Sequence, residues 1–161
     1  MKTLSLKHIS FREMSALGSA VAVALVAYLY FPEALMLANS TLHGLLPNGN
    51  PYVMDKAGMM MRYAVGSVIA LAVLQIIYHI VIAILWRREA GERADERDRM
   101  VNLKAGRVAY LVMVAGLCAV VWILLAYNIS SIVAAQYAYM VLFAGELIRY
   151  AAIFVYYRLS V

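Results

Sequence analysis

The sequence predicts an all-α membrane protein, a single transmembrane domain of residues 1–161 that folds as a bundle of four transmembrane helices. Of its 161 residues, 65% are hydrophobic and only 14% are charged, whereas soluble domains carry about 25% charged residues. A domain of this size has too little interior to hide so much apolar surface, so the excess is expected to face lipid. Four apolar stretches are long enough to cross a bilayer, which takes about 17–25 helical residues each.

The four expected spans cover, in order, about residues 14–31, 60–86, 108–127 and 131–157. The first is expected to stop at Pro32, because proline cannot continue the helical hydrogen-bond pattern. The third and fourth spans are separated by only three residues, 128–130, so they must form an antiparallel hairpin. Small residues recur at fourfold spacing in three of the spans, a pattern that lets helices approach closely within a protomer or between subunits. These rows are Ala16, Ala20 and Ala24; Ala115 and Ala119; and Ala134 and Ala138.

The first outer loop, residues 32–59, is expected to contain a short interfacial helix. Pro32 and Glu33 suit the first turn of a helix, since proline fits there and an acid complements the positive helix end. The segment from Ala34 to Leu46 then reads as amphipathic, before the turn cluster of residues 47–51. We therefore expect this segment to lie along the membrane surface.

Lysine and arginine counts set the expected orientation, because cytoplasmic loops carry the excess of basic residues. The first outer loop is expected to be external because it carries only Lys56 ahead of the second span, with Arg62 just inside it. The N-terminal segment and the loop between the second and third spans are much more basic. Their basic residues are Lys2, Lys7, Arg12, Arg87, Arg88, Arg93, Arg97, Arg99, Lys104 and Arg107. Both termini and this loop are therefore expected in the cytoplasm, with the chain in the plasma or inner membrane.

An intramembrane polar cluster is the strongest functional signal. It comprises Gln75, His79, Tyr139, Glu146, Arg149 and Tyr150. At about 1.5 Å per residue, Glu146 and Gln75 each lie roughly 18 Å from the basic residue at the cytoplasmic end of their helix. Matched depths predict that the second and fourth spans are neighbours. Two interpretations stay open: a structural one, in which Glu146 and Arg149 neutralise each other and hold the helices in register, and a functional one, in which Glu146 and His79 titrate along an ion path.

The charged loop, residues 87–107, is the second candidate site. Its partner-binding residues are expected to be Glu92, Arg93, Asp95, Glu96, Arg97, Asp98 and Arg99. Opposite charges recur four residues apart, a pattern typical of a solvated helix, either continuous with the second span or broken near Gly91. The helix either only sets the topology or docks a cytoplasmic protein or anionic lipid headgroups.

Residues 92–99, together with Lys104, Arg107 and the following Val-Ala-Tyr, resemble the signature of small four-span membrane proteins of archaea and bacteria, a family of unknown function. The resemblance covers about 20 residues. It implies a multi-span membrane protein but no reaction, substrate or cofactor. Genes of this kind are expected beside small helix-turn-helix regulators, which favours a partner-binding role.

Three functions follow as hypotheses. The first is a non-enzymatic oligomer, a conduit for protons or small ions or a membrane sensor. The second is a membrane anchor or regulator that binds a cytoplasmic protein through residues 87–107. The third is an enzyme acting on lipid or quinone, with His79 and Glu146 as acid and base. No metal site, cofactor or nucleic-acid partner is expected, because the single cysteine, Cys118, lies in an apolar run and the basic residues flank the spans.

Overall fold

The computed structural model describes residues 10–42, 50–86, 95–127 and 129–159. Within these ranges the chain forms four α-helices: α1 (Phe11–Leu42), α2 (Pro51–Leu85), α4 (Glu96–Tyr127) and α5 (Ser131–Leu159). Each is long and apolar enough to cross a membrane. The expected all-α chain with four candidate spans is therefore confirmed.

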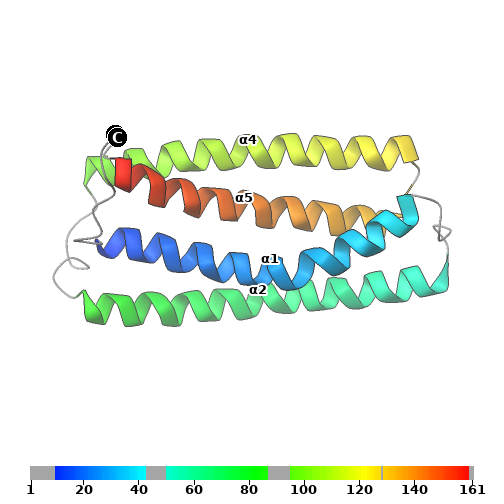
Figure 1. The fold of residues 1–161 in the computed structure, drawn as a ribbon, viewed down its shortest axis with the longest axis horizontal. Helices are drawn as coiled ribbons and strands as arrows, with labels where there is room; N and C mark the ends of the chain where they lie inside the picture. Colours follow the sequence, from blue (N-terminus) through cyan, green and yellow to red (C-terminus); the bar gives the residue numbers. More distant parts are fainter. Residues whose placement is uncertain (1–9, 43–49, 87–94, 128, 160–161) are drawn as a thin grey trace.

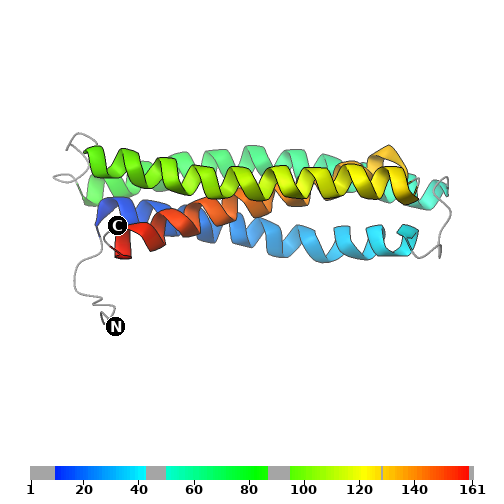
Figure 2. The same ribbon diagram turned by 90° about the horizontal axis from the view of Figure 1, so that it is seen from above.

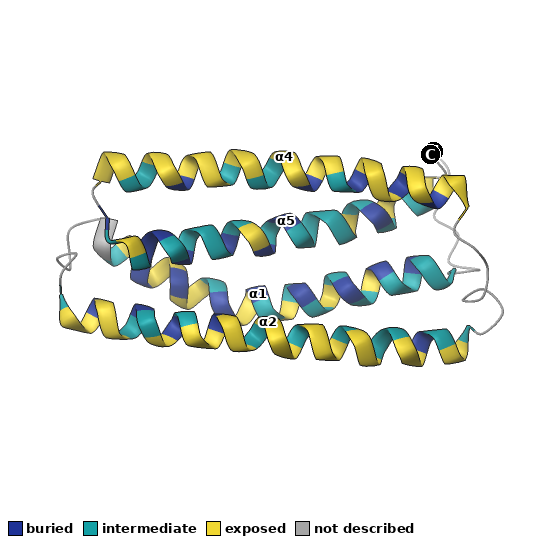
Figure 3. Cartoon of the chain, turned by 180° about the vertical axis from the view of Figure 1, so that it is seen from behind, coloured by how far each residue is buried: buried dark blue, intermediate teal, exposed yellow. Residues whose placement is uncertain are grey.

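The helices lie lengthwise beside one another in the order α4, α5, α1, α2 (Figure 1). The start of α1 and the end of α5 lie at the same end of the bundle (Figure 2), which we call the termini end. Buried residues concentrate on α1 and α5, whereas α2 and α4 are largely exposed (Figure 3). Because the large hydrophobic side chains exposed on α2 and α4 are mostly Leu, Ile and Val, these two helices provide much of the surface that suits lipid.

The expected end of the first helix at Pro32 is wrong, because α1 continues through Pro32 to Leu42. Figure 1 shows α1 bending along its length, as helices do where proline removes one hydrogen bond and crowds the preceding turn. Beyond the proline, Ala34, Leu37 and Ala38 are buried at helical spacing against α2 and α5. This packing keeps the segment helical, so residues 34–42 belong to α1 rather than to a separate interfacial helix; residues 43–46 lie outside the described residues.

Two other helices begin earlier than the apolar stretches predict. The α2 helix begins at Pro51 instead of near residue 60, because the Asn50 side chain accepts a hydrogen bond from the Tyr52 amide at 2.9 Å and caps the helix. The α4 helix begins at Glu96 instead of near residue 108. The charged residues 96–107 are therefore helical and continuous with the third span, not with the second. The fourth helix begins at Ser131 as expected and ends at Leu159, two residues later than predicted.

Glycine sets the close packing of α4 on α5. A β-carbon added at Gly116 would lie 2.6 Å from Cγ1 of Val141, and one at Gly145 would lie 2.3 Å from Cγ of Met113. Ala115 and Ala119, the predicted small-residue row in the third span, are both exposed, so they do not form the α4–α5 contact, and a contact between subunits stays a prediction. The neighbouring Gly116 faces α5 instead.

Candidate functional site

Four of the six residues of the predicted polar cluster line one cavity. This Glu146 pocket has a volume of about 260 Å³, and its polar walls are Gln75 from α2 and Tyr139, Glu146 and Tyr150 from α5. The remaining walls are apolar side chains of α1, α2 and α5. The α2 and α5 helices are in contact, as the matched depths of Gln75 and Glu146 predict.

Glu146 and Arg149 form a loose ion pair within α5. The shortest contact, between Nη1 of Arg149 and Oε2 of Glu146, is 3.5 Å. The side chain of Arg149 stays 43% exposed, and that of Glu146 stays 41% exposed. Since an exposed pair at this distance gains little Coulomb energy, the two charges do not fully compensate each other within one chain.

His79 lies outside the Glu146 pocket and joins α2 to α1. Its Nε2 atom is 2.8 Å from Oγ of Ser15, and its Nδ1 atom is 2.6 Å from the carbonyl oxygen of Gln75. The adjacent Tyr78 ring packs over Gly18, and its hydroxyl donates to the Met14 carbonyl at 2.7 Å. Both ring nitrogens of His79 are thus engaged, which leaves the acid–base pair of the enzyme hypothesis unassembled.

A second buried polar group, the side chain of Gln136, lies closer to the end of the bundle opposite the termini end. It was not predicted from the sequence. The Gln136 side chain donates to the Ala57 carbonyl at 2.9 Å and accepts a hydrogen bond from the Tyr30 hydroxyl. Gln136 is 1% exposed. The hydroxyl of nearby Tyr139 donates to the Ala64 carbonyl at 2.5 Å, and its ring meets that of Tyr30 at 5.5 Å. Gln136 stands three residues before Tyr139, so the predicted polar cluster could have been extended along the fourth span to include it.

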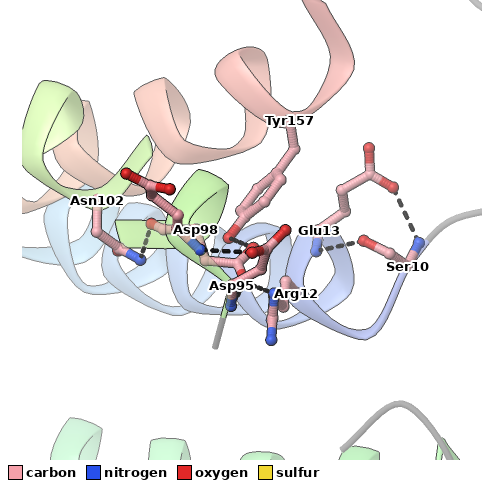
Figure 4. A network of polar contacts seen from close by, with 8 residues as sticks. Ser10, Arg12, Glu13, Asp95, Asp98, Asn102 and Tyr157 are labelled. Carbon is pink, nitrogen blue, oxygen red and sulfur yellow. Dashed lines mark hydrogen bonds and ion pairs between the residues drawn. The ribbon is translucent and has the colours of Figure 1, made fainter. Parts of the chain in front are cut away.

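At the termini end, an ionic clasp joins α1, α4 and α5 (Figure 4). We give this name to Arg12, Glu13, Asp98, Tyr157 and Arg158. The Asp98 carboxylate, 8% exposed, forms an ion pair with Arg12 of α1 and accepts a hydrogen bond from the Tyr157 hydroxyl of α5 at 2.9 Å. Nε of Arg158 lies 3.3 Å from the Glu13 carboxylate, which closes the connection from α5 back to α1. A buried carboxylate needs such partners to remain charged.

Both carboxylates of the clasp also cap their own helices. Glu13 accepts from the Ser10 amide at 2.9 Å, and the Ser10 hydroxyl lies 3.3 Å from the Glu13 amide (Figure 4). Asp98 accepts from the Asp95 amide at 2.8 Å. The reciprocal pair of contacts between Ser10 and Glu13 is a capping box. The Ser10-x-x-Glu13 spacing is the signal from which the part of the clasp on α1 could have been predicted.

The residues of the predicted partner loop have different roles in the structure. Glu92 and Arg93 lie outside the described residues. Asp95 and Asp98 serve the cap of α4, and Arg97 donates to the Tyr157 carbonyl at 3.2 Å. Glu96 and Arg99 are exposed and remain accessible to a partner.

Arg149 and Tyr150 connect the polar cluster to the termini end. Both line a further cavity of about 250 Å³, together with Arg12 and Asp98 of the clasp. The guanidinium of Arg149 lies over the Tyr150 ring at 5.8 Å from its centroid. Because Tyr150 lines this cavity and the Glu146 pocket as well, the two cavities adjoin.

No family model, curated protein or solved structure matches this chain. The resemblance to small four-span membrane proteins thus stays an expectation from residues 92–110. Within the described ranges, no group of three or more His, Cys, Asp or Glu side chains is arranged to hold a metal ion. The candidate site is accordingly the Glu146 pocket and the cavities that adjoin it.

Proposed function

We propose that this chain is a non-enzymatic membrane protein that works as an oligomer and conducts protons past Glu146. The observation that carries the proposal is the half-exposed Glu146 carboxylate in a cavity within a candidate span. An ionisable side chain at the bilayer centre costs about 2.5–3.5 kcal/mol even on the mildest scale. A single 3.5 Å contact to Arg149 does not offset this cost, so Glu146 must face water or a neighbouring subunit.

Polar side chains at three levels of the bundle support a path rather than an isolated site. The Glu146 pocket adjoins the cavity at the termini end. Toward the opposite end, a third cavity of about 260 Å³ is lined by Tyr30, Glu33, Tyr63 and Ser67. The Tyr30 and Tyr139 rings join this cavity to the Glu146 pocket. Chains of carboxylate and hydroxyl groups of this kind are typical of proton relays in membranes.

The position of the Glu146 pocket at the surface of the bundle supports the proposed oligomer. One chain covers Glu146 only in part, and the exposed Leu142 of α5 borders the same cavity. A second copy placed on this face would shield the carboxylate from lipid. The basic residues at the termini end favour a cytoplasmic location for that end.

Proton flux into liposomes tests the conduit. A pH-sensitive dye inside the vesicles is expected to report flux with the natural chain and at least about tenfold less with Glu146→Gln, since removing the titrating group interrupts a relay. The matched control is Glu96→Gln, which neutralises an exposed carboxylate outside the pocket and is expected to conduct normally. Equal flux through the Glu146→Gln and natural chains, or none through either, would overturn the proposal.

Cross-linking tests the oligomer separately. In a Cys118→Ala background, a cysteine at position 142 is expected to form a disulfide-linked dimer in membranes. A cysteine at Leu125, which is exposed on α4 away from the pocket, is the control and is expected to stay monomeric. The reverse result would place the subunit contact on α4.

A second candidate function is docking of a cytoplasmic protein on the start of α4. The supporting observation is a broad groove of about 890 Å³ along residues 95–103, where exposed Glu96 and Arg99 stand beside exposed Met100 and Leu103. A pull-down from cell extract is expected to lose its partner when Glu96 and Arg99 are changed to Gln together. Retention of the same partner by this variant would argue against docking at α4.

A further inference from the structure

The cavity at the termini end is lined by three helices and combines positive charge with apolar walls. It has a volume of about 250 Å³. Its charged side chains are Arg12 of α1, Asp98 of α4 and Arg149 of α5. Phe11, Ala16 and Ile153 contribute apolar walls.

The balance of charge in this cavity favours an anion. Two arginines face one carboxylate, and that carboxylate is already engaged by Arg12 and the Tyr157 hydroxyl. Arg149 is less well compensated, since its contacts within the described chain are the 3.5 Å approach to Glu146 and the ring of Tyr150. A guanidinium carries five N–H donors. Most of the donors of Arg149 are therefore available to a ligand that can only accept hydrogen bonds.

The position of the cavity indicates the class of ligand. Arg149 lies nine residues before Arg158 along α5, or about 13 Å inside the end of the helix. Outside the protein, the acceptors closest to this depth are the phosphates of the adjacent leaflet, toward which a long arginine side chain can extend. Basic pockets between transmembrane helices bind anionic headgroups by this geometry. We propose that the cavity between α1, α4 and α5 binds the phosphate of an anionic phospholipid, with Arg149 as its principal donor.

Native mass spectrometry of the whole chain in micelles of equal phosphatidylglycerol and phosphatidylcholine tests the proposal. The natural protein is expected to retain phosphatidylglycerol selectively, and Arg149→Gln is expected to retain about tenfold less, the size of effect that loss of charge-assisted hydrogen bonds produces. Arg149→Lys is expected to fall between the two, because lysine keeps the charge but loses the planar fork. The matched control, Arg107→Gln, removes an exposed arginine of α4 that does not line the cavity and is expected to bind normally.

Two further measurements keep the proposal falsifiable. If Arg149→Gln does not fold, Asn102→Leu, which fills the cavity from its α4 wall, is expected to reduce phosphatidylglycerol retention instead. Inorganic phosphate added to phosphatidylcholine micelles is expected to leave the thermal transition unchanged. The proposal is overturned by unselective retention, by retention that both cavity variants leave unchanged, by equal losses in Arg149→Gln and Arg107→Gln, or by stabilisation with inorganic phosphate alone. None of these outcomes depends on whether the protein conducts protons.

Discussion

The α1, α4 and α5 helices are joined to one another at the termini end, whereas α2 is held by contacts along its length. The ionic clasp connects α1, α4 and α5 through two ion pairs and the Tyr157 hydroxyl. The α2 helix contacts α1 through Tyr78 and His79 and, near the opposite end, through the ion pair of Lys56 with Glu33. Near that end it also contacts α5, where Gln136 donates to the Ala57 carbonyl. Between these attachments the Glu146 pocket separates α2 from α5.

The difference identifies α2 as the helix that can move with the least disruption. Displacing α4 or α5 would separate buried charges at the clasp, which is costly. Displacing α2 near Gln75 would break single hydrogen bonds, such as those of Tyr78 and His79 to α1, each of which contributes only about 0.5–1.5 kcal/mol. A movement of α2 would also open the Glu146 pocket, so the weaker attachment lies where the proposed conduction needs it.

Removing the central carboxylate of the clasp is expected to have the largest effect. Asp98→Ala removes the buried carboxylate that pairs with Arg12 and accepts a hydrogen bond from the Tyr157 hydroxyl. Breaking one side of a buried pair costs about 3–5 kcal/mol, so we expect the free energy of unfolding in mixed detergent micelles to fall by about 3 kcal/mol. Glu96→Gln, two residues away and exposed, should change it by less than about 0.5 kcal/mol. Equal effects of the two variants would mean that the clasp does not stabilise the bundle.

The clasp was missed from the sequence because its members are separated along the chain. Asp98 and Arg12 are brought together by tertiary packing alone, and each stands in a charged segment that also reads as a topology signal. The apolar stretches located all four helices, because lipid-facing helices need long apolar runs wherever they pack. They underestimated the lengths of α2 and α4, because charged residues interrupt the apolar pattern early in both helices, such as Lys56, which pairs with Glu33, and Asp98.

The polar cluster was likewise predictable in part: the depth of its residues could be predicted, but not the direction in which they point. Depth along the helix predicted that Gln75 and Glu146 would lie at one level, and both line the same pocket. Depth carries no information about rotation of one helix against another. In the structure His79 faces Ser15 of α1 instead of α5, next to Tyr78, which packs over Gly18 of α1.

Overpacking the α4–α5 contact is expected to have an intermediate effect. Gly116→Val introduces a branched side chain where a β-carbon already lies 2.6 Å from Val141. Excess volume in a packed contact costs about 1–3 kcal/mol, and we expect a loss of this size in the unfolding free energy. Gly106→Val on the same helix has nothing within 4 Å of its new β-carbon and controls for the helix propensity of valine. If both variants lose the same stability, the close approach at Gly116 is not what holds α4 to α5.

Loosening α2 is expected to have the smallest effect on stability and the most local one. Ser15→Ala removes the partner of Nε2 of His79, which is worth about 1 kcal/mol. Because α1, α4 and α5 stay joined by the clasp, hydrogen exchange in micelles should become faster in the half of α2 around His79 and remain unchanged in α5. Ser131→Ala, an exposed serine at the start of α5, should alter neither helix. Faster exchange in all four helices after Ser15→Ala would mean that α2 opens only together with the rest of the bundle, and the contrast between the clasped helices and α2 would then be lost.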